Sequence, residues 1–137
     1  MVSSISIALT GLDAASKRLN ASASNIANLQ TTGSLEEGGQ KPYAPVTTQH
    51  TAITDTQGGV QGVSTKMVQR SDPFVAAFDP DSPHADANGL IGVPDIDLSE
   101  EAVHMLLAET QFKASLAALR TSDEMSSELF RLFDKKV

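Results

Sequence analysis

The chain has 137 residues, a formal net charge of −7 and no cysteine, and only 4% of its residues are aromatic. The length fits a single domain, and most apolar burial has to come from alanine, valine, leucine and isoleucine. The lack of cysteine excludes disulfides and thiolate chemistry, and the negative charge disfavours nucleic acid as a partner, because such binding needs clustered lysine and arginine. No apolar run reaches the ~20 residues of a membrane span, so we expect no direct membrane insertion, and the N-terminal stretch does not read as a cleavable signal peptide.

Glycine and proline divide the chain into three parts. All six prolines and eight of the nine glycines lie between Thr31 and Asp97. Because these residues interrupt regular structure, we expect an N-terminal helix in residues 1–30, a Gly/Pro-rich β and loop insert in 31–97, and a C-terminal helix in 98–137. The sequence therefore predicts a mainly α fold with a small β-rich insert.

The first helical segment carries a heptad pattern. One register is large and apolar, and a second, three residues later, is mostly small: Ile5, Leu12, Leu19 and Ile26, then Ala8, Ala15, Ser22 and Leu29. Such a pattern is typical of a helix packed lengthwise on another helix, and the small register allows close approach.

The second helical segment is apolar on two sides. Asp97 or Ser99 can cap it, and Glu100 and Glu101 fall in its first turn, where negative charge suits the helix dipole. Its main stripe comprises Val103, Leu107, Thr110, Ala114, Ala117, Thr121, Met125, Leu129 and Leu132, and the opposite side holds Leu98, Met105, Phe112, Leu116 and Leu119. Polar seams separate the two, one of them formed by His104, Ser115 and Ser122. A helix with two apolar faces is normally buried between partners, and this chain is too short to cover both. We therefore expect other chains to cover them, with the terminal helices forming a coiled-coil-like core in an assembly.

The insert contains short extended pieces. We expect strands at residues 43–53, 60–68 and 74–78, a turn at Gly58-Gly59, a bulge at Gly62 and a loop over residues 79–88.

No pattern in the sequence indicates an enzyme or a cofactor site. His50, His84 and His104 have no ligand spacing. The segment that starts at His84 resembles half of a calcium loop, but histidine replaces the first carboxylate and Asp95 stands where a glutamate belongs, so we interpret it as a turn. No phosphate loop, nucleophile elbow or acid–base pair is present, so we expect no metal, no cofactor and no catalysis.

Two stretches resemble flagellar axial proteins, the family of rod, hook and hook-associated subunits. Residues 20–33 end in Asn25-Ile-Ala-Asn28-Leu-Gln-Thr-Thr-Gly33 and are similar to the family's N-terminal signature, an Asn-Asn-Ile-Ala-Asn-like core followed by Thr-Thr-Gly. Residues 72–101, with His84-Ala-Asp-Ala-Asn88 and Pro94-Asp-Ile-Asp97, are similar to the proximal-rod branch, which has a His-Pro-Asp-Ala-Asp-like loop before its last helix. Residues 39–43 also resemble that branch, so the likeness covers nearly the full length.

The resemblance implies a structural subunit of the bacterial flagellar basal-body proximal rod. Such proteins pass through the flagellar type III export apparatus without signal cleavage after synthesis in the cytoplasm. Their terminal helices pack with further copies and with other rod proteins into the tubular, periplasm-spanning drive shaft. The alternative is a soluble helical adaptor or export-chaperone-like module that captures a partner helix.

The heptad, the two-sided helix and the family signature together predict an assembly interface. For the amides of Asn25 and Asn28, two readings stay open: a solvated polar face, or hydrogen bonds to a neighbouring subunit. We interpret Gly33 as a helix stop with a positive φ. The predicted interface comprises Ile5, Leu12, Leu19, Asn25, Ile26, Asn28, Met105, Phe112, Leu116, Leu119, Met125 and Leu129.

Overall fold

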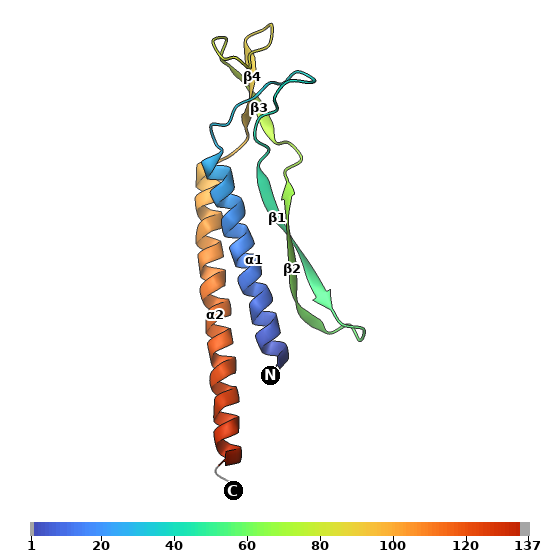
Figure 1. The fold of residues 1–137 in the computed structure, drawn as a ribbon, viewed down its shortest axis with the longest axis vertical. Helices are drawn as coiled ribbons and strands as arrows, with labels where there is room; N and C mark the ends of the chain where they lie inside the picture. Colours follow the sequence, from blue (N-terminus) through green and yellow to red (C-terminus); the bar gives the residue numbers. More distant parts are fainter. Residues whose placement is uncertain (1, 135–137) are drawn as a thin grey trace.

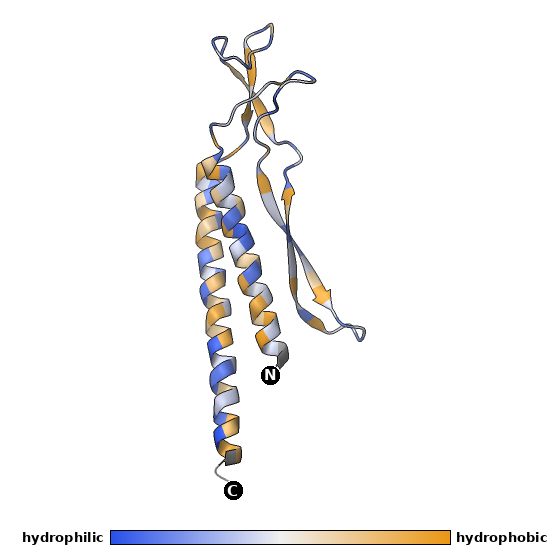
Figure 2. Ribbon diagram, viewed as in Figure 1, coloured by the Kyte–Doolittle hydropathy of each residue, from blue (hydrophilic) through white to orange (hydrophobic). Residues whose placement is uncertain are grey.

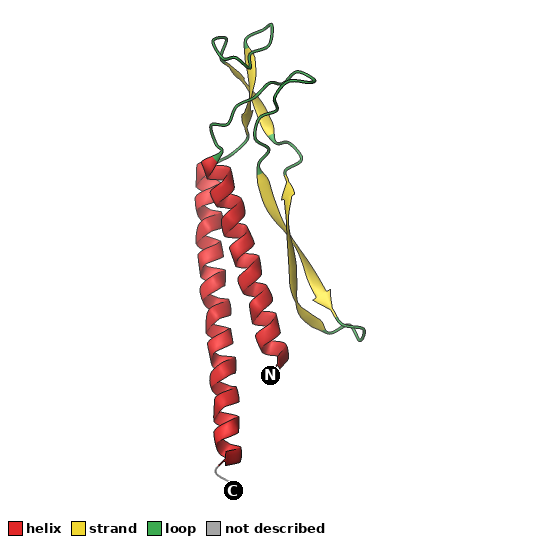
Figure 3. Ribbon diagram, in the orientation of Figure 1, coloured by secondary structure: helices red, strands yellow, loops and turns green. Residues whose placement is uncertain are grey.

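The computed structural model describes residues 2–134 as two long helices and two β-hairpins (Figure 3). This confirms the expected mainly α fold with a small β-rich insert. The elements in chain order are α1 (Val2–Ala27), β1 (Val46–Thr54), β2 (Val60–Gln69), β3 (Phe74–Phe78), β4 (Leu90–Pro94) and α2 (Leu98–Asp134).

The two helices lie antiparallel, side by side, and α2 is the longer (Figure 1). Asn25 contacts Glu101, and Gly11 lies against Ser115. These two pairs are equally spaced on both helices, so Val2 is level with Glu124. The last segment of α2, residues 125–134, therefore extends past the start of α1.

An aspartate cap begins α2. The Oδ1 atom of Asp97 accepts hydrogen bonds from the backbone N–H of Ser99 at 2.7 Å and of Glu100 at 3.4 Å. These backbone donors, Ser99 first, hold the pKa of the Asp97 carboxyl below its usual value. Of the two candidate caps, Asp97 is the one that fills this role.

The β1–β2 hairpin lies beside α1, on the side away from α2 (Figure 1). Its strands match the predicted ones, except that β1 begins at Val46, after Pro45, and not at residue 43, and that each strand ends one residue later than expected. Gln61 and Gly62 together face Ile53, which is the predicted bulge, and Gly62 has a φ of 128°. The hairpin turn holds Gly58 at a φ of 82°.

Two side chains of α1 fasten the edge of β2. Thr10 Oγ1 accepts a hydrogen bond from the N–H of Val63 at 3.1 Å, and Lys17 Nζ donates to the C=O of Thr65 at 3.0 Å. The hairpin is therefore held along the helix by hydrogen bonds to its backbone.

The β3–β4 hairpin projects beyond the end of the helix pair where α1 finishes and α2 begins (Figure 1). Strand β3 matches the prediction, whereas β4 was not expected, since Gly92 and Pro94 both weigh against a strand. Hydrogen-bonded pairing on both sides stabilises β4 despite its low strand propensity, because β4 lies between β3 and an isolated bridge to Gly33.

Gly33 serves a close approach of backbone, and the prediction of a positive φ there is wrong. A Cβ atom at this position would lie 2.3 Å from the nitrogen of Pro42 and 2.5 Å from the carbonyl oxygen of Gln40. The residue is thus small because another segment of chain crosses directly over it.

Small residues dominate the interior. Apart from prolines, the buried aliphatic side chains of the described chain are Ala8, Ala14, Ala15, Ala21, Ala108 and Ile91. Neither helix, within residues 2–134, is both long and apolar enough to span a bilayer.

Candidate assembly interface

The contact between α1 and α2 uses small side chains. Ala8, Ala15 and Ser22, the small register of the heptad, are buried on α1. They face the side of α2 that carries Ala108 and Ser115, and a Cβ atom on Gly11 would lie only 2.5 Å from Ser115 Oγ. The helices therefore meet along the small register of α1 and the seam of α2 that includes His104, Ser115 and Ser122.

This packing leaves the main apolar stripe of α2 without cover. Val103, Leu107, Met125 and Leu132 are each about half exposed, at 54%, 49%, 59% and 58%. The intervening residues of the stripe are exposed as well: Thr110, Ala114, Ala117, Thr121 and Leu129. Figure 2 shows hydrophobic residues recurring along α2 to its C-terminal end, beyond the start of α1.

A groove of about 730 Å³ between α1 and α2 gathers predicted interface residues from both helices. Leu19 of α1 and Met105 and Phe112 of α2 line it, with Leu106 beside them. Leu19 and Phe112 are each 41% exposed, and Leu106 is 64% exposed. Because the main stripe lies on the other side of α2, the helix pair presents two separate apolar surfaces.

The remaining apolar residues of the predicted interface differ in exposure. Ile5, Leu12, Leu116 and Leu119 are half-buried. Ile26 is 36% exposed, and Met125 and Leu129 belong to the main stripe.

Asn25 is 1% exposed, and its amide bonds only to groups of its own chain among the described residues. Its Nδ2 donates to the C=O of Val46 at 2.8 Å and to Glu101 Oε1 at 2.7 Å. Its Oδ1 accepts from the N–H of Val46 at 2.9 Å and from the Tyr43 hydroxyl at 3.1 Å. These four bonds use both donors and both lone pairs of the amide within one chain, and the expected place of Asn25 in an assembly interface stays a prediction.

Asn28 also bonds locally. Its Nδ2 donates to the C=O of Ser24 at 2.9 Å, one turn earlier, and its Oδ1 accepts from Thr31 Oγ1 at 3.3 Å. Its side chain is half-buried, at the point where α1 gives way to turns.

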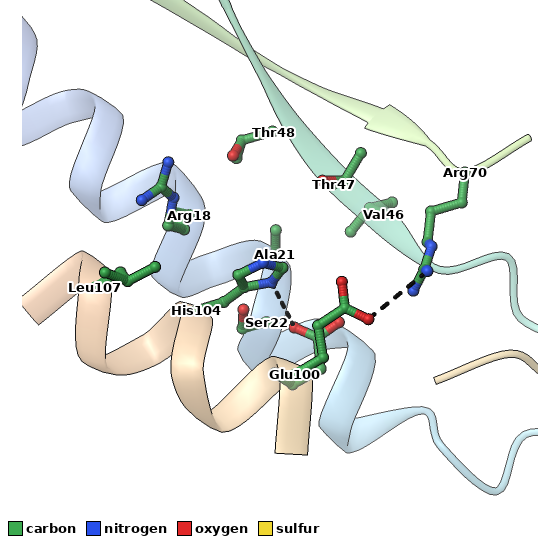
Figure 4. Close-up of a pocket in the computed structure, with 11 residues that line it drawn as sticks. Arg18, Ala21, Ser22, Val46, Thr47, Thr48, Arg70, Glu100, His104 and Leu107 are labelled. Carbon is green, nitrogen blue, oxygen red and sulfur yellow. Dashed lines mark ion pairs between the residues drawn. The ribbon is translucent and has the colours of Figure 1, made fainter. Parts of the chain in front are cut away.

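A polar cleft of about 380 Å³ separates α2 from β1 on the hairpin side of α1 (Figure 4). Arg70 Nη2 lies 3.8 Å from Glu100 Oε2, which ties the end of the β1–β2 hairpin to the first turn of α2. Glu101 is 3% exposed, and its Oε2 lies 3.8 Å from His104 Nδ1 and has no hydrogen-bond partner within the described residues. The contact across this cleft, between the hairpin and α2, is therefore made by the charged side chains of Arg70 and Glu100.

The sequence analysis missed Glu101 and Tyr43 as hydrogen-bond partners of the Asn25 amide. It placed Glu101 only among the first-turn acids of the helix. The signal was the seven-residue spacing from Glu101 to Ala108, Ser115 and Ser122, which puts the carboxylate on the packed face.

The three histidines do not come together. His50 bonds Thr65 Oγ1 at 2.9 Å and accepts from Arg18 Nη2 at 3.1 Å, while His104 lies beside Glu101. Partial burial, and then the charge of Arg18, hold the pKa of His50 below its usual value. Residues 2–134 contain no cluster of histidine and carboxylate side chains able to hold a metal ion.

Comparisons with known proteins place the chain in a family. Residues 5–33 match the family described as "Flagella basal body rod protein". A flagellar basal-body rod protein FlgC of Agrobacterium fabrum is 34% identical over 121 residues, which cover 87% of this chain and 85% of the relative. The FlgC proteins of Salmonella typhimurium and Aquifex aeolicus are 31% and 26% identical, with 87% and 92% of both chains covered.

These relatives are structural proteins of the rod and not enzymes, in agreement with the expectation from the sequence, and they do not favour the alternative of a soluble adaptor. The chain belongs to the FlgC family of flagellar basal-body rod proteins, the structural subunits of the rod.

Proposed function

We propose that this subunit joins the proximal rod through two apolar surfaces on opposite sides of its helix pair. One is the main stripe of α2, and the other is the groove lined by Leu19, Met105 and Phe112. The single observation that carries the proposal is that both surfaces stay uncovered after α1 and α2 have packed together. Each large side chain covered by a neighbour would contribute about 1.5–3 kcal/mol.

The placement of these surfaces favours an open assembly. The main stripe and the groove differ from each other, so a stripe on one subunit that meets a groove on the next makes a heterologous contact. Repeated heterologous contacts build a helical array unless the rotation happens to close a ring. The terminal helices would then form a coiled-coil-like core of the tubular drive shaft.

The three segments of the chain would have different places in the rod. Residues 1–30 and 98–137 would make the core, and residues 31–97 would lie around it. Half-buried Ile5, Leu12, Leu116 and Leu119, and exposed Ile26, would be covered by neighbours together with the two surfaces. Asn25 would take part indirectly, because it fixes the helix pair that presents them.

Other rod proteins and further copies of the chain would be the neighbours. The family resemblance supports synthesis in the cytoplasm, passage through the flagellar type III export apparatus without signal cleavage, and a final place in the periplasm-spanning rod.

The adaptor alternative would instead give a closed complex of low order. Light scattering with negative-stain imaging separates the two, since rod subunits should form tubes or enter a rod fraction.

A charge placed on each surface tests the proposal. In flagellated cells that carry only the variant, Met125→Asp in the stripe or Leu19→Asp in the groove should abolish swimming and remove the subunit from purified basal bodies. Gln57→Asp, in the exposed hairpin turn, is the matched control and should swim normally. Circular dichroism of the purified variants should match the parent. Normal swimming of both helix variants would rule out the two surfaces as contacts.

A further inference from the structure

One edge of strand β3, the edge away from β4, has no pairing partner within residues 2–134. The hydrogen bonds of Gly92, on β4, show which backbone groups of β3 lie along this edge. The N–H of Gly92 donates to the C=O of Gly33 at 2.8 Å, and its C=O accepts from the N–H of Gly33 at 3.0 Å. Both groups of Gly92 therefore point away from β3. Ala76 is directly opposite Gly92 in the antiparallel pair, so its own N–H and C=O point away from β4.

The alternation of an antiparallel strand extends this result to Phe74 and Phe78. Their β4 partners are Pro94, which has no N–H, and Leu90, whose N–H and C=O bond Asp86. Within residues 2–134, no hydrogen bond uses the outward backbone groups of these three residues, and β3 packs on no helix or strand besides β4. Ala76 and Phe78 are exposed, Phe78 at 73%. Such an edge is a template for pairing with another chain.

The charged residues of the β3–β4 hairpin are all acidic, and the basic residue beside it is Arg70, whose Nη1 donates to the C=O of Asp95 at 3.3 Å. Residues 71–99 contain neither lysine nor arginine. Their charged residues are Asp72, Asp79, Asp81, Asp86, Asp95 and Asp97. Asp79 follows β3 directly, and Asp72 precedes it with Pro73 in between.

This charge distribution selects the kind of strand that can pair. If β3 of a second copy paired antiparallel with Phe74 opposite Phe78, Asp72 would come between Asp79 and Asp81 of that copy. Like charges so close across a sheet destabilise the pair, so self-pairing is disfavoured. Lysine or arginine on the flanks of the incoming strand would be stabilised by the same aspartates.

We propose that β3 binds an extended segment of another protein chain that carries a lysine or arginine on each flank. The backbone of Phe74, Ala76 and Phe78 would supply the hydrogen bonds, and the aspartates would select the charge. Exposed Val75 and Phe78 would pack against the apolar side chains of the segment. This site is separate from the helix surfaces proposed above, and its test uses the purified single chain, so either proposal can fail alone.

A labelled peptide tests the strand addition directly. The probe is a short, capped peptide of alternating threonine and valine with one lysine at each end, followed by fluorescence anisotropy at low salt. Ala76→Pro removes an N–H that points away from β4, so it should leave the hairpin intact and weaken peptide binding about tenfold, as expected for one lost backbone hydrogen bond. Ala76→Thr keeps the N–H and should bind like the parent.

A second experiment tests whether the charge of the peptide controls its binding. A peptide with glutamate in place of both lysines should bind at least about tenfold more weakly, because like charges oppose each other across the sheet. Asp79→Asn combined with Asp81→Asn should weaken the lysine peptide and reduce its salt dependence. Equal binding of the two peptides, or equal binding by Ala76→Pro and Ala76→Thr, would overturn the proposal.

Hydrogen exchange completes the test. Protection of Val75 and Ala77 in the Ala76→Pro variant shows that β3 still pairs with β4. If that pairing is lost, a peptide with a proline at its centre replaces the variant and should not bind the parent chain. A contrary outcome is that the chain forms concentration-dependent dimers, that Ala76→Pro abolishes them, and that the lysine peptide does not bind. This outcome would assign the edge to a second copy of the chain and overturn the proposal of a basic partner.

Discussion

The side chain of Asn25 donates a hydrogen bond to the carboxylate of Glu101 at 2.7 Å, across a separation of 76 residues. The bond joins the last turn of α1 to the first turn of α2. The same amide accepts from Tyr43 and pairs with both backbone groups of Val46, at the start of β1. One buried side chain thereby connects both helices and the insert.

Removal of this amide should destabilise the monomer. Asn25→Ala leaves Val46 and buried Glu101 without their partner, and we expect the free energy of unfolding to fall by about 3 kcal/mol. Urea denaturation followed by circular dichroism measures the change. Asn28→Ala, one residue past the end of α1 and half-buried, is the control and should cost much less. A loss for Asn25→Ala no larger than that of the control would contradict the network described here.

A side chain at Gly33 should disturb the crossing with the 40–42 segment. The nearest atoms to an added Cβ are backbone atoms, which cannot rotate away, so Gly33→Ala should cost about 1–3 kcal/mol. Gly38 provides the comparison, because it has a φ of 89° and a Cβ added there would meet no atom within 4 Å. Asparagine tolerates that φ, so Gly38→Asn should be milder than Gly38→Ala, whereas Gly33→Asn should be at least as harmful as Gly33→Ala. Thermal unfolding of the four variants tests this difference.

The stability of the chain should decrease in mild acid through His50. Its pKa is lowered in the folded state, by partial burial first and by Arg18 second, so the unfolded chain takes up the proton earlier as the pH falls. The contribution is complete above the unfolded pKa of about 6.5 and is lost between that value and the lower folded pKa. Melting temperatures between pH 7.5 and 5.5 should fall less steeply for His50→Gln than for the parent. Arg18→Met should flatten the curve only in part, and an unchanged slope in His50→Gln would assign the effect to other groups.

Asp97 should stabilise α2 more strongly while it is ionised. Its folded pKa is lowered by the N–H groups of Ser99 and Glu100, so its contribution is present above the unfolded pKa and is lost as the pH falls through the folded pKa. Asp97→Asn keeps an acceptor for these N–H groups and should show a weaker acid dependence, while Asp97→Ala should be less stable at neutral pH. Melting curves from neutral to acidic pH measure both effects. Identical acid profiles of Asp97→Asn and the parent would disprove the role of ionisation.

The end of α2 should change its exchange behaviour on assembly. Residues 125–134 extend beyond α1 and hold Phe130 and Phe133 at 75% and 72% exposure, so their amides should exchange rapidly in the monomer. In isolated rods the same amides should become protected, because neighbours would cover this segment. The amides around Ala108, which is 2% exposed within the single chain, serve as the reference that is protected in both states. Rapid exchange of residues 125–134 in rods would show that this segment takes no part in the contacts.

Several elements could be predicted because their signals are local. The heptad of α1, the Asp97 cap, the Gly58-Gly59 turn and the Gly62 bulge each depend on residues close in sequence. Strand β4 could not be predicted, since Gly92 and Pro94 lack strand propensity and acquire the strand conformation from β3 and Gly33. Gly33 shows the same limit, because its need for a small residue comes from the crossing of the 40–42 segment, and the φ expected from local rules was wrong.

The sequence by itself determined that two terminal helices carry more apolar surface than the chain can cover, because hydrophobic periodicity depends only on the order of residues along a helix. It also carried the family signature. Only the tertiary structure decided which face of α2 meets α1. The helices approach closely where Ala15, Ala108 and Ser115 leave room, so the larger apolar residues are turned outward. The tertiary structure likewise made Asn25 a buried link between both helices and the insert, because its partners come from parts of the chain that are close together only after folding.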